Sequence, residues 1–347
     1  MGETAVMPRC QGNKCSKTDP SMGQKGCPVN VPLNLPLAQS AVDRDYLQRD
    51  NPDLFDLLWE NPQTRVLAMF EGEVLLKEAP QSGAESALPE LRLLPIDAVP
   101  SAQLRVYLGK TTADQGAEPA GTPVVLAVLG QNSANQVEAN PENWHGLRKT
   151  GAGLSARDAG LYAQALAIAN FHLNHTFCPR CGMPTTVAQG GWKRTCYSDG
   201  TDVFPRTDPA IIVSVIDDQD RILLGSQGVW EENRWSILAG FVEPGESLTA
   251  AVIREIYEEA GVHIHEVEYL GSQAWPFPYS LMMGFTAKLD PVAGQQQIVP
   301  DGMEIEKLRW FTREEIAAER ASLILPGKLT IARHIIDRWF GGDIDGI

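Results

Sequence analysis

The chain has 347 residues, of which 43% are hydrophobic, enough for two or three packed units. Lys and Arg number 29 against 44 Asp and Glu, so the formal charge is −15. This charge opposes sequence-independent binding to nucleic acid or anionic lipid, and an anionic substrate therefore needs a local cation. The longest apolar run, 123–129, is too short to span a bilayer, and no apolar stretch of signal-peptide length follows the first basic residues. We expect a cytoplasmic protein without a membrane partner.

The first segment, residues 1–36, mixes Gly, Pro, Ser, Lys and Gln with almost no aliphatic periodicity, which predicts a disordered tail. Its cysteines, Cys10, Cys15 and Cys27, have no His or fourth Cys nearby, so incidental thiols are favoured over a metal site. Six cysteines do not make a disulfide scaffold in a chain of this size. Three of the six lie close together in a metal-like spacing, which favours a reducing compartment.

Three units are predicted after the tail. Residues 37–172 alternate strand-like runs, at 65–70, 74–76 and 124–128, with a helix-like stretch at 155–173, and so predict an α+β domain. We find no catalytic constellation there and interpret it as a packing or dimerisation platform. Residues 173–206, punctuated by Gly and Pro, predict a small knuckle. Apolar strands at 210–215 and 221–224 open the third unit, 207–347.

A helix rich in carboxylates lies in this third unit. Ser247 suits the N-cap position, and Gly261 suits the C-terminal end. At about 100° per residue, three acids share one arc beside an apolar arc: Glu255, Glu258 and Glu259. Like charges at this spacing mildly destabilise a helix, so hard cations between them are one explanation. For the acids alone, a solvated charged face is an equally good one.

The helix belongs to a longer pattern running from Gly240 to Val262. It reads Gly, five residues, Glu, seven residues, then Arg-Glu-aliphatic-any-Glu-Glu-any-Gly-aliphatic, and every fixed position is filled. A chance match at ordinary residue frequencies is rarer than roughly one in a million. The pattern resembles the Nudix box, which identifies the chain as a member of the Nudix superfamily. The resemblance implies a C-terminal α/β/α sandwich with a mixed sheet, in a chain of α+β class.

The resemblance also implies roles for residues of the box. Divalent Mg²⁺ or Mn²⁺ would be held by the three helix glutamates and the Ala239 carbonyl, oriented by Arg254 and braced by Glu246. In the family a further acid precedes a Trp-Phe strand, and Glu304 matches that position as an added ligand or base assistant. Lys307 stands where the family often has a second acid. A diphosphate carries two negative charges, so the ions would both neutralise its oxygens and activate water.

A second motif bears on the substrate. The segment from Ser272 to Ser280 resembles the Ser-Gln-Pro-Trp-Pro-Phe-Pro-any-Ser sequence of NADH pyrophosphatases, and departs from it only at Ala274. Its prolines stiffen the loop, so that Trp275 and Phe277 can offer fixed faces to a flat ring. The resemblance, which covers about 38–340, implies a substrate-binding set: Phe204, Phe241, Gln273, Ala274, Trp275, Pro276, Phe277, Pro278, Tyr279, Ser280 and Ala332. As core residues, Phe204 and Ala332 would fit equally well.

The knuckle resembles the zinc ribbon of the same family. Cys178 and Cys181 form the first pair, but the second pair is Cys196 and Asp199, because Asp replaces the fourth Cys. This sequence is consistent with a structural Zn²⁺ site in which Asp199 or His175 is the fourth ligand. It is equally consistent with a ribbon that no longer binds zinc. The knuckle also holds a basic cluster whose default interpretation is a solvated face: Arg180, Lys193, Arg194 and Arg206.

The resemblance implies hydrolysis of NADH or NAD⁺ to AMP and the nicotinamide mononucleotide, by a protein that is a homodimer. Removal of an NAD cap from RNA 5′ ends is a second hypothesis, which the basic cluster modestly favours and the charge of −15 does not. A hypothesis of another class is a catalytically silent Nudix-fold sensor of NAD or ADP-ribose. The intact glutamates speak against the sensor, since a binding protein has no need to keep them all.

Overall fold

The computed structural model describes residues 33, 35–38, 41–77, 88–291 and 297–346. The three cysteines of the predicted tail, and nearly all of that tail, lie outside these residues. Leu35, at the end of the predicted tail, is 1% exposed and belongs to a hydrophobic core. Residues 32–347 form one compact unit. Across the described ranges, every helix is too short or too polar to cross a membrane.

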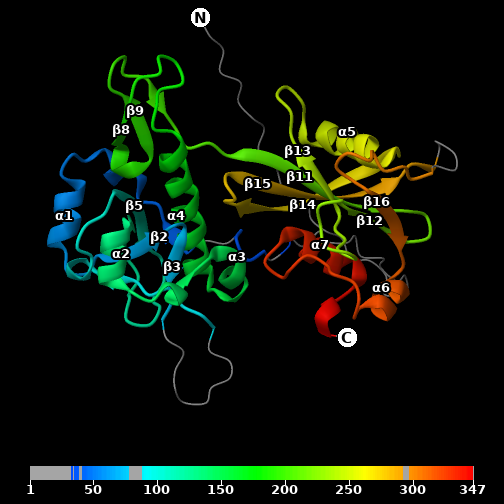
Figure 1. Cartoon of the computed structure of the whole chain (residues 1–347), viewed down its shortest axis with the longest axis horizontal. Helices are drawn as coiled ribbons and strands as arrows, with labels where there is room; N and C mark the ends of the chain where they lie inside the picture. The colour runs from blue at the N-terminus through cyan, green and yellow to red at the C-terminus, as the bar shows by residue number, and fades with distance from the viewer. Residues whose placement is uncertain (1–32, 34, 39–40, 78–87, 292–296, 347) are drawn as a thin grey trace, which may run out of the picture. The chain divides into compact units, whose positions relative to one another are not determined.

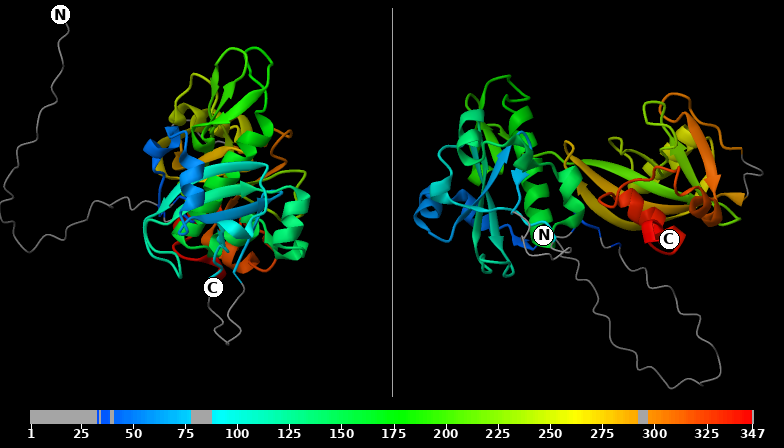
Figure 2. Two further views of the ribbon diagram at one scale, coloured as in Figure 1. Left: turned by 90° about the vertical axis from the view of Figure 1, so that its left-hand side faces the viewer. Right: turned by 60° about the horizontal axis from the view of Figure 1, so that its bottom comes forward.

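The first domain is built on a sheet of seven short strands in the order β1-β5-β6-β2-β3-β7, with β4 beside β2 (Figures 1 and 2). The strands are β1 Val42–Asp43, β2 Arg65–Phe70, β3 Glu73–Leu75, β4 Leu94–Pro95, β5 Leu104–Thr111, β6 Pro123–Val128 and β7 Trp144–His145. The helices are α1 Leu54–Glu60, α2 Gln131–Val137, α3 Leu147–Thr150 and α4 Ala156–Asn174. The predicted strands at 65–70, 74–76 and 124–128 are confirmed to within one residue.

Helix α4 provides most of this domain's helical core. Ser155 caps it, because its Oγ accepts a hydrogen bond from the Asp158 amide at 3.2 Å. Leu161 and Tyr162 are fully buried in the same cluster as the β5 and β6 side chains. The predicted helix is therefore confirmed, and it places its C-terminal turn next to the knuckle.

The knuckle is a three-stranded antiparallel sheet in the order β10-β9-β8. Its strands are β8 Thr185–Ala188, β9 Lys193–Cys196 and β10 Asp202–Val203. Arg194, on β9, is 8% exposed and donates hydrogen bonds to the Thr185 hydroxyl at 2.6 Å and to His172 Nδ1 at 3.0 Å. The prediction of a solvated basic face is therefore wrong for Arg194, whose guanidinium ties the knuckle to α4.

The third domain is a mixed six-stranded sheet in the order β14-β15-β11-β12-β16, with β13 beside β11. Only β11 and β15 pair in parallel; the other pairs are antiparallel. The strands are β11 Asp208–Ile216, β12 Ile222–Ser226, β13 Leu238–Phe241, β14 Ile264–Trp275, β15 Ser280–Leu289 and β16 Lys307–Phe311. The helices are α5 Leu248–Ala260, α6 Arg313–Glu319 and α7 Ile331–Phe340.

Helices α5 and α7 cover opposite faces of this sheet (Figure 1). Successive side chains of a strand point to opposite faces, so Ile211 packs into the α5 core and Ile212 into the α7 core. The predicted α/β/α sandwich with a mixed sheet is thus confirmed, within a chain of α+β class.

Candidate active site and metal-binding residues

Helix α5 has the predicted ends. The Ser247 Oγ accepts a hydrogen bond from the Ala250 amide at 3.1 Å, and Gly261 ends the helix with a φ of 68°. That left-handed conformation favours glycine, because a Cβ would meet the backbone. Val252 and Ile256 are fully buried against the sheet. The apolar arc therefore fixes the helix and leaves the carboxylate arc at the edge of the packed surface.

Arg254 connects the helix to the loop before it. Its guanidinium donates to Glu246 at 2.7 Å, to Glu258 at 2.8 Å and to the Phe241 carbonyl at 3.0 Å, and lies 3.0 Å from Glu255. The hydrogen bond to Glu246, then those to Glu258 and Glu255, hold the pKa of Arg254 above its usual range. One cation thus positions three carboxylates and one backbone carbonyl.

Glu246 links the loop before α5 to Arg254. Its Oε1 accepts a hydrogen bond from the Glu243 amide at 2.7 Å, while Arg254 holds both of its oxygens. On the other side, Gly240 of β13 lies against the Glu255 carboxylate so closely that a Cβ would overlap it. A side chain at this position would push the Glu255 carboxylate away from the strand, which gives the fixed glycine of the box a steric reason.

Glu259 is the buried member of the carboxylate arc. It is 4% exposed, and its Oε2 is buried without a hydrogen-bond partner. Burial, followed by the negative charges of Glu304, Glu255, Asp301 and Glu258, raises the pKa of Glu259 to about 8. A buried carboxylate oxygen that faces other acids and lacks a donor fits a divalent cation, because a cation would neutralise the whole group.

The other two helix glutamates are more accessible. The Glu258 side chain is 55% exposed and that of Glu255 13% exposed. Glu304 lies in the segment before β16, where the amides of Glu304 and Ile305 donate to the Asp301 carboxylate at 3.1 and 2.8 Å. Asp301 was not among the predicted site residues. The sequence offered a signal for it, an acid three positions before Glu304, but no motif that marked it.

A cavity of about 480 Å³ lies on the α7 side of the sheet. Three predicted substrate-binding residues line it, Gln273, Trp275 and Ala332. It is also lined by residues that sequence reasoning missed, chiefly in the segment before β13: Trp230, Arg234, Trp235 and Ser236. That segment carries no recognisable motif, so only the fold brings it to the cavity.

Gln273 is fully buried, and both ends of its amide are engaged. Its Nε2 donates to the Leu329 carbonyl, and its Oε1 accepts from the Ile331 amide, each at 2.8 Å. It therefore fixes the start of α7, where Ala332 is 5% exposed and lines the cavity. The alternative that Phe204 is a core residue is wrong, because its side chain is 60% exposed. Phe241 is exposed to the same extent.

The rest of the Pro-aromatic segment lies on the hairpin that joins β14 to β15. Trp275 ends β14 and pairs with Ser280 at the start of β15, and Ala274 pairs with Leu281. Between the strands, Pro276 to Pro278 line a second cavity instead of the 480 Å³ one, and Tyr279 is 8% exposed in the core of the first domain.

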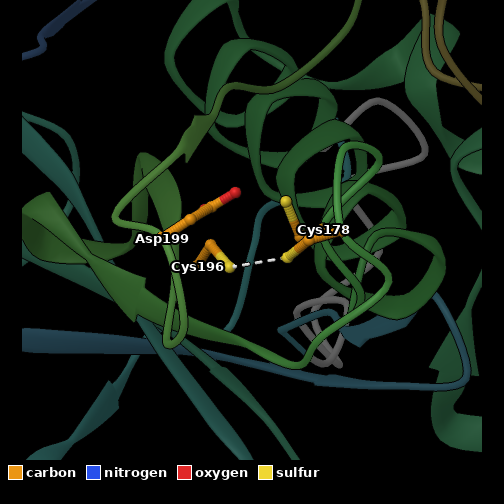
Figure 3. A group of neighbouring side chains, drawn as sticks. Cys178, Cys196 and Asp199 are labelled. Carbon is orange, nitrogen blue, oxygen red and sulfur yellow. Dashed lines mark hydrogen bonds between the residues drawn. The ribbon is translucent and has the colours of Figure 1, made fainter.

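The knuckle brings four metal-binding side chains together. Among the described residues, Cys178, Cys181, Cys196 and Asp199 are the one group whose ligand atoms all lie within 4.8 Å of one another (Figure 3). Glu255, Glu258 and Glu259 do not form such a group among the described residues. The sulfurs of Cys181 and Cys196 are 3.4 Å apart, and a hydrogen bond from Cys196, then bonds from Thr201, lower the pKa of Asp199 to about 2. Three thiols and an ionised carboxylate fit a tetrahedral Zn²⁺ site.

The fourth member of the group is Asp199 and not His175. The His175 ring stacks on Phe171, and its Nδ1 lies 3.1 Å from the Phe171 carbonyl. The knuckle's other cations are matched by acids: Arg180 with Asp199 at 3.9 Å, Lys193 with Asp202 at 2.8 Å and Arg206 with Asp208 at 2.9 Å. The cations of the basic cluster are thus largely paired with acids of the knuckle and of β11.

Fold and box together define a Nudix domain with two further modules before it. Three family models match the chain: a NUDIX domain at 205–330, an NADH pyrophosphatase zinc ribbon domain at 173–204, and an NADH pyrophosphatase-like rudimentary NUDIX domain at 63–170. The chain therefore carries a NUDIX domain, preceded by the two domains that these models describe for NADH pyrophosphatases. The first domain, interpreted from sequence as a platform, is by this match a relative of the third.

Two curated relatives of the chain are named NAD-capped RNA hydrolases. The chain is 43% identical over 203 residues to the NAD-capped RNA hydrolase NudC of Mycobacterium tuberculosis strain H37Rv, a match covering 56% of this chain and 64% of that protein. It is 37% identical over 200 residues to the human NAD-capped RNA hydrolase NUDT12, covering 54% and 42%. The chain thus spans less than two thirds of either relative. A NUDIX hydrolase of Nitrosomonas europaea matches in structure at 22% identity, with a TM-score of 0.37, over 48% of this chain and 94% of that one.

Proposed function

We propose that the protein hydrolyses the central diphosphate of NADH or NAD⁺ to AMP and the corresponding nicotinamide mononucleotide. The observation that supports this most directly is the buried, unpartnered Oε2 of Glu259 within a group of five acids. Glu255, Glu258 and Glu259 would hold Mg²⁺ or Mn²⁺, with the Ala239 carbonyl and Glu304 as further ligands. When bound, such an ion neutralises diphosphate oxygens and lowers the pKa of the attacking water.

The chain's own residues would divide the remaining tasks. Arg254 holds the Oε2 atom of Glu258 by a hydrogen bond, and the other oxygen of this exposed carboxylate would stay available to the ion. Glu246 keeps Arg254 in place. The 480 Å³ cavity has Trp230, Trp235 and Trp275 in its walls, and aromatic walls suit a flat nucleotide ring.

Product analysis tests the proposal. Purified protein incubated with NADH and Mn²⁺ should give AMP and reduced nicotinamide mononucleotide by chromatography, and a chelator should stop the reaction. Turnover of ADP-ribose without cleavage of NADH would keep the Nudix chemistry and overturn the substrate assignment. Tight NADH binding with no turnover would revive the sensor hypothesis.

Removal of the NAD cap from RNA is a second candidate, because the mycobacterial and human relatives are both named NAD-capped RNA hydrolases. The same diphosphate would be cleaved. The deciding measurement is kcat/KM for a capped RNA and for NADH, in wild type and in Arg180→Ala and Lys193→Ala variants. A larger fall in kcat/KM for the capped RNA than for NADH would support this candidate. Arg194 is unsuitable because its guanidinium is buried. The homodimer and the cytoplasmic location stay predictions, and light scattering would check the first.

The knuckle would hold a structural Zn²⁺ through Cys178, Cys181, Cys196 and Asp199, with no open position for chemistry. Asp199→Cys should restore four thiolates, and Zn²⁺ prefers this softer set. We expect zinc release to a competing chelator to become several-fold slower (~3-fold or more), measured with a colorimetric indicator. Asp218→Cys, which adds a thiol on an exposed turn, is the matched control. Purified wild-type protein without bound zinc would contradict the assignment.

A further inference from the structure

The turn between β14 and β15 is shared by two cavities. Trp275 lines the 480 Å³ cavity beside α7. The next three residues, Pro276, Phe277 and Pro278, line a different cavity of about 1000 Å³, together with side chains of the first domain such as Arg148 and Asn170. The residue that faces the proposed substrate is therefore continuous with residues that contact the first domain.

Arg148 of α3 holds the aromatic part of this turn. Its guanidinium carbon lies 4.0 Å from the ring centroid of Phe277 and 5.2 Å from that of Trp275. The two rings meet edge to face, with centroids 4.9 Å apart. No carboxylate of the described residues pairs with Arg148, so its charge is directed to the rings. Leu147, next to it, is 1% exposed and anchors α3 in the core.

Asn170 of α4 holds the backbone of the same turn. Its Nδ2 donates to the carbonyls of Pro276 and Pro278, at 3.1 and 3.2 Å. The Asn170 carbonyl accepts from the Tyr279 hydroxyl at 3.0 Å, and Asn174 donates to that hydroxyl at 2.7 Å. Proline has no N–H, so a turn with two prolines can make few hydrogen bonds of its own, and α4 supplies the missing donors.

From these contacts we propose that the first domain positions the substrate-binding turn of the Nudix domain, with Arg148 and Asn170 as its positioning residues. Neither residue touches the carboxylates of α5. Both act through Trp275, whose ring forms part of the wall against which a nucleotide ring would stack. They therefore govern the affinity for the dinucleotide and not the rate of the hydrolytic step. This inference rests on the proposed function, because it takes NADH as the occupant of the cavity.

The test separates binding from chemistry. We expect Arg148→Ala and Asn170→Asp each to raise KM for NADH roughly ten-fold, with kcat within about two-fold of wild type, because such a pattern marks lost uniform binding. Asn170→Asp keeps the size of the side chain and removes its N–H donors. Arg148→Lys keeps a cation over the rings and should recover part of the affinity. The Kd for NADH, measured by its fluorescence without metal, should change in parallel with KM.

Arg105→Ala is the matched control, because it removes a guanidinium 4.1 Å from the Trp59 ring in the same domain and leaves the turn untouched. It should leave KM and Kd unchanged. Wild-type KM and Kd retained in both Arg148→Ala and Asn170→Asp, or a fall in kcat with KM unchanged, would overturn the inference while the proposed function stands. A wild-type protein that neither binds nor cleaves NADH would overturn the proposed function and this inference with it.

Discussion

Replacing Glu259 by Gln will lower kcat for NADH by about 10²- to 10⁴-fold, the range expected when a group that acts in the transition state is lost. The substitution keeps the shape of the side chain but removes the charge that would bind the ion. The Glu259 carboxylate is 4% exposed, and no hydrogen-bond donor of the described residues holds its Oε2 atom, which leaves this oxygen to an ion. Steady-state kinetics with saturating Mn²⁺ measure the effect.

Two comparisons make this result specific. Glu142→Gln removes an exposed carboxylate from the first domain and should leave kcat unchanged. In metal-free buffer at pH 8.5, Glu259→Gln should melt several degrees above wild type, because it replaces an ionised carboxylate buried among other acids. A variant with both lower activity and a lower melting temperature would point to a folding defect, and a kcat within about three-fold of wild type would exclude Glu259 as a ligand.

The parts of the site that the sequence predicted best are governed by local rules. Ser247 and Gly261 mark the ends of α5 because capping depends on residues one turn away. The spacing of Glu255, Glu258 and Glu259 likewise follows from helix geometry. Their unequal exposure does not, since it depends on the sheet and on the segment around Asp301, which the chain reaches some forty residues later.

The sequence could not predict contacts between distant segments of the chain. Trp230 and Arg234 reach the 480 Å³ cavity only because the sheet brings their loop beside the start of α7. Arg194 looked like one cation in a basic cluster, and only the packing of β9 against α4 shows that it is buried beside His172. A motif identifies residue types, whereas burial is a property of the assembled core.

The affinity for Mg²⁺ will rise with pH, and the reason is the proton that Glu259 retains in the metal-free protein. Its pKa is raised to about 8 by burial and by the surrounding acids, so below that pH the ion must displace a proton. We expect affinity to rise by up to about ten-fold per pH unit between pH 5 and 8 and then to level off. Calorimetric titrations in buffers of different ionisation enthalpy measure the affinity and count the released proton.

The raised pKa of Glu259 also determines how the stability of the metal-free protein changes with pH. A carboxyl whose pKa is higher in the folded than in the unfolded chain favours folding below the unfolded value, 4.5, and that stability is lost as pH rises through the folded value of about 8. Metal-free protein should therefore lose stability across this window, and Mg²⁺ should raise the melting temperature more at pH 8.5 than at pH 5.5. In Glu259→Gln the group does not titrate, so both dependences should flatten. If the Mg²⁺ affinity of wild type is equal at pH 5.5 and 8.5, Glu259 is already ionised without metal. Burial and the charges of Glu304 and Asp301 then do not raise its pKa.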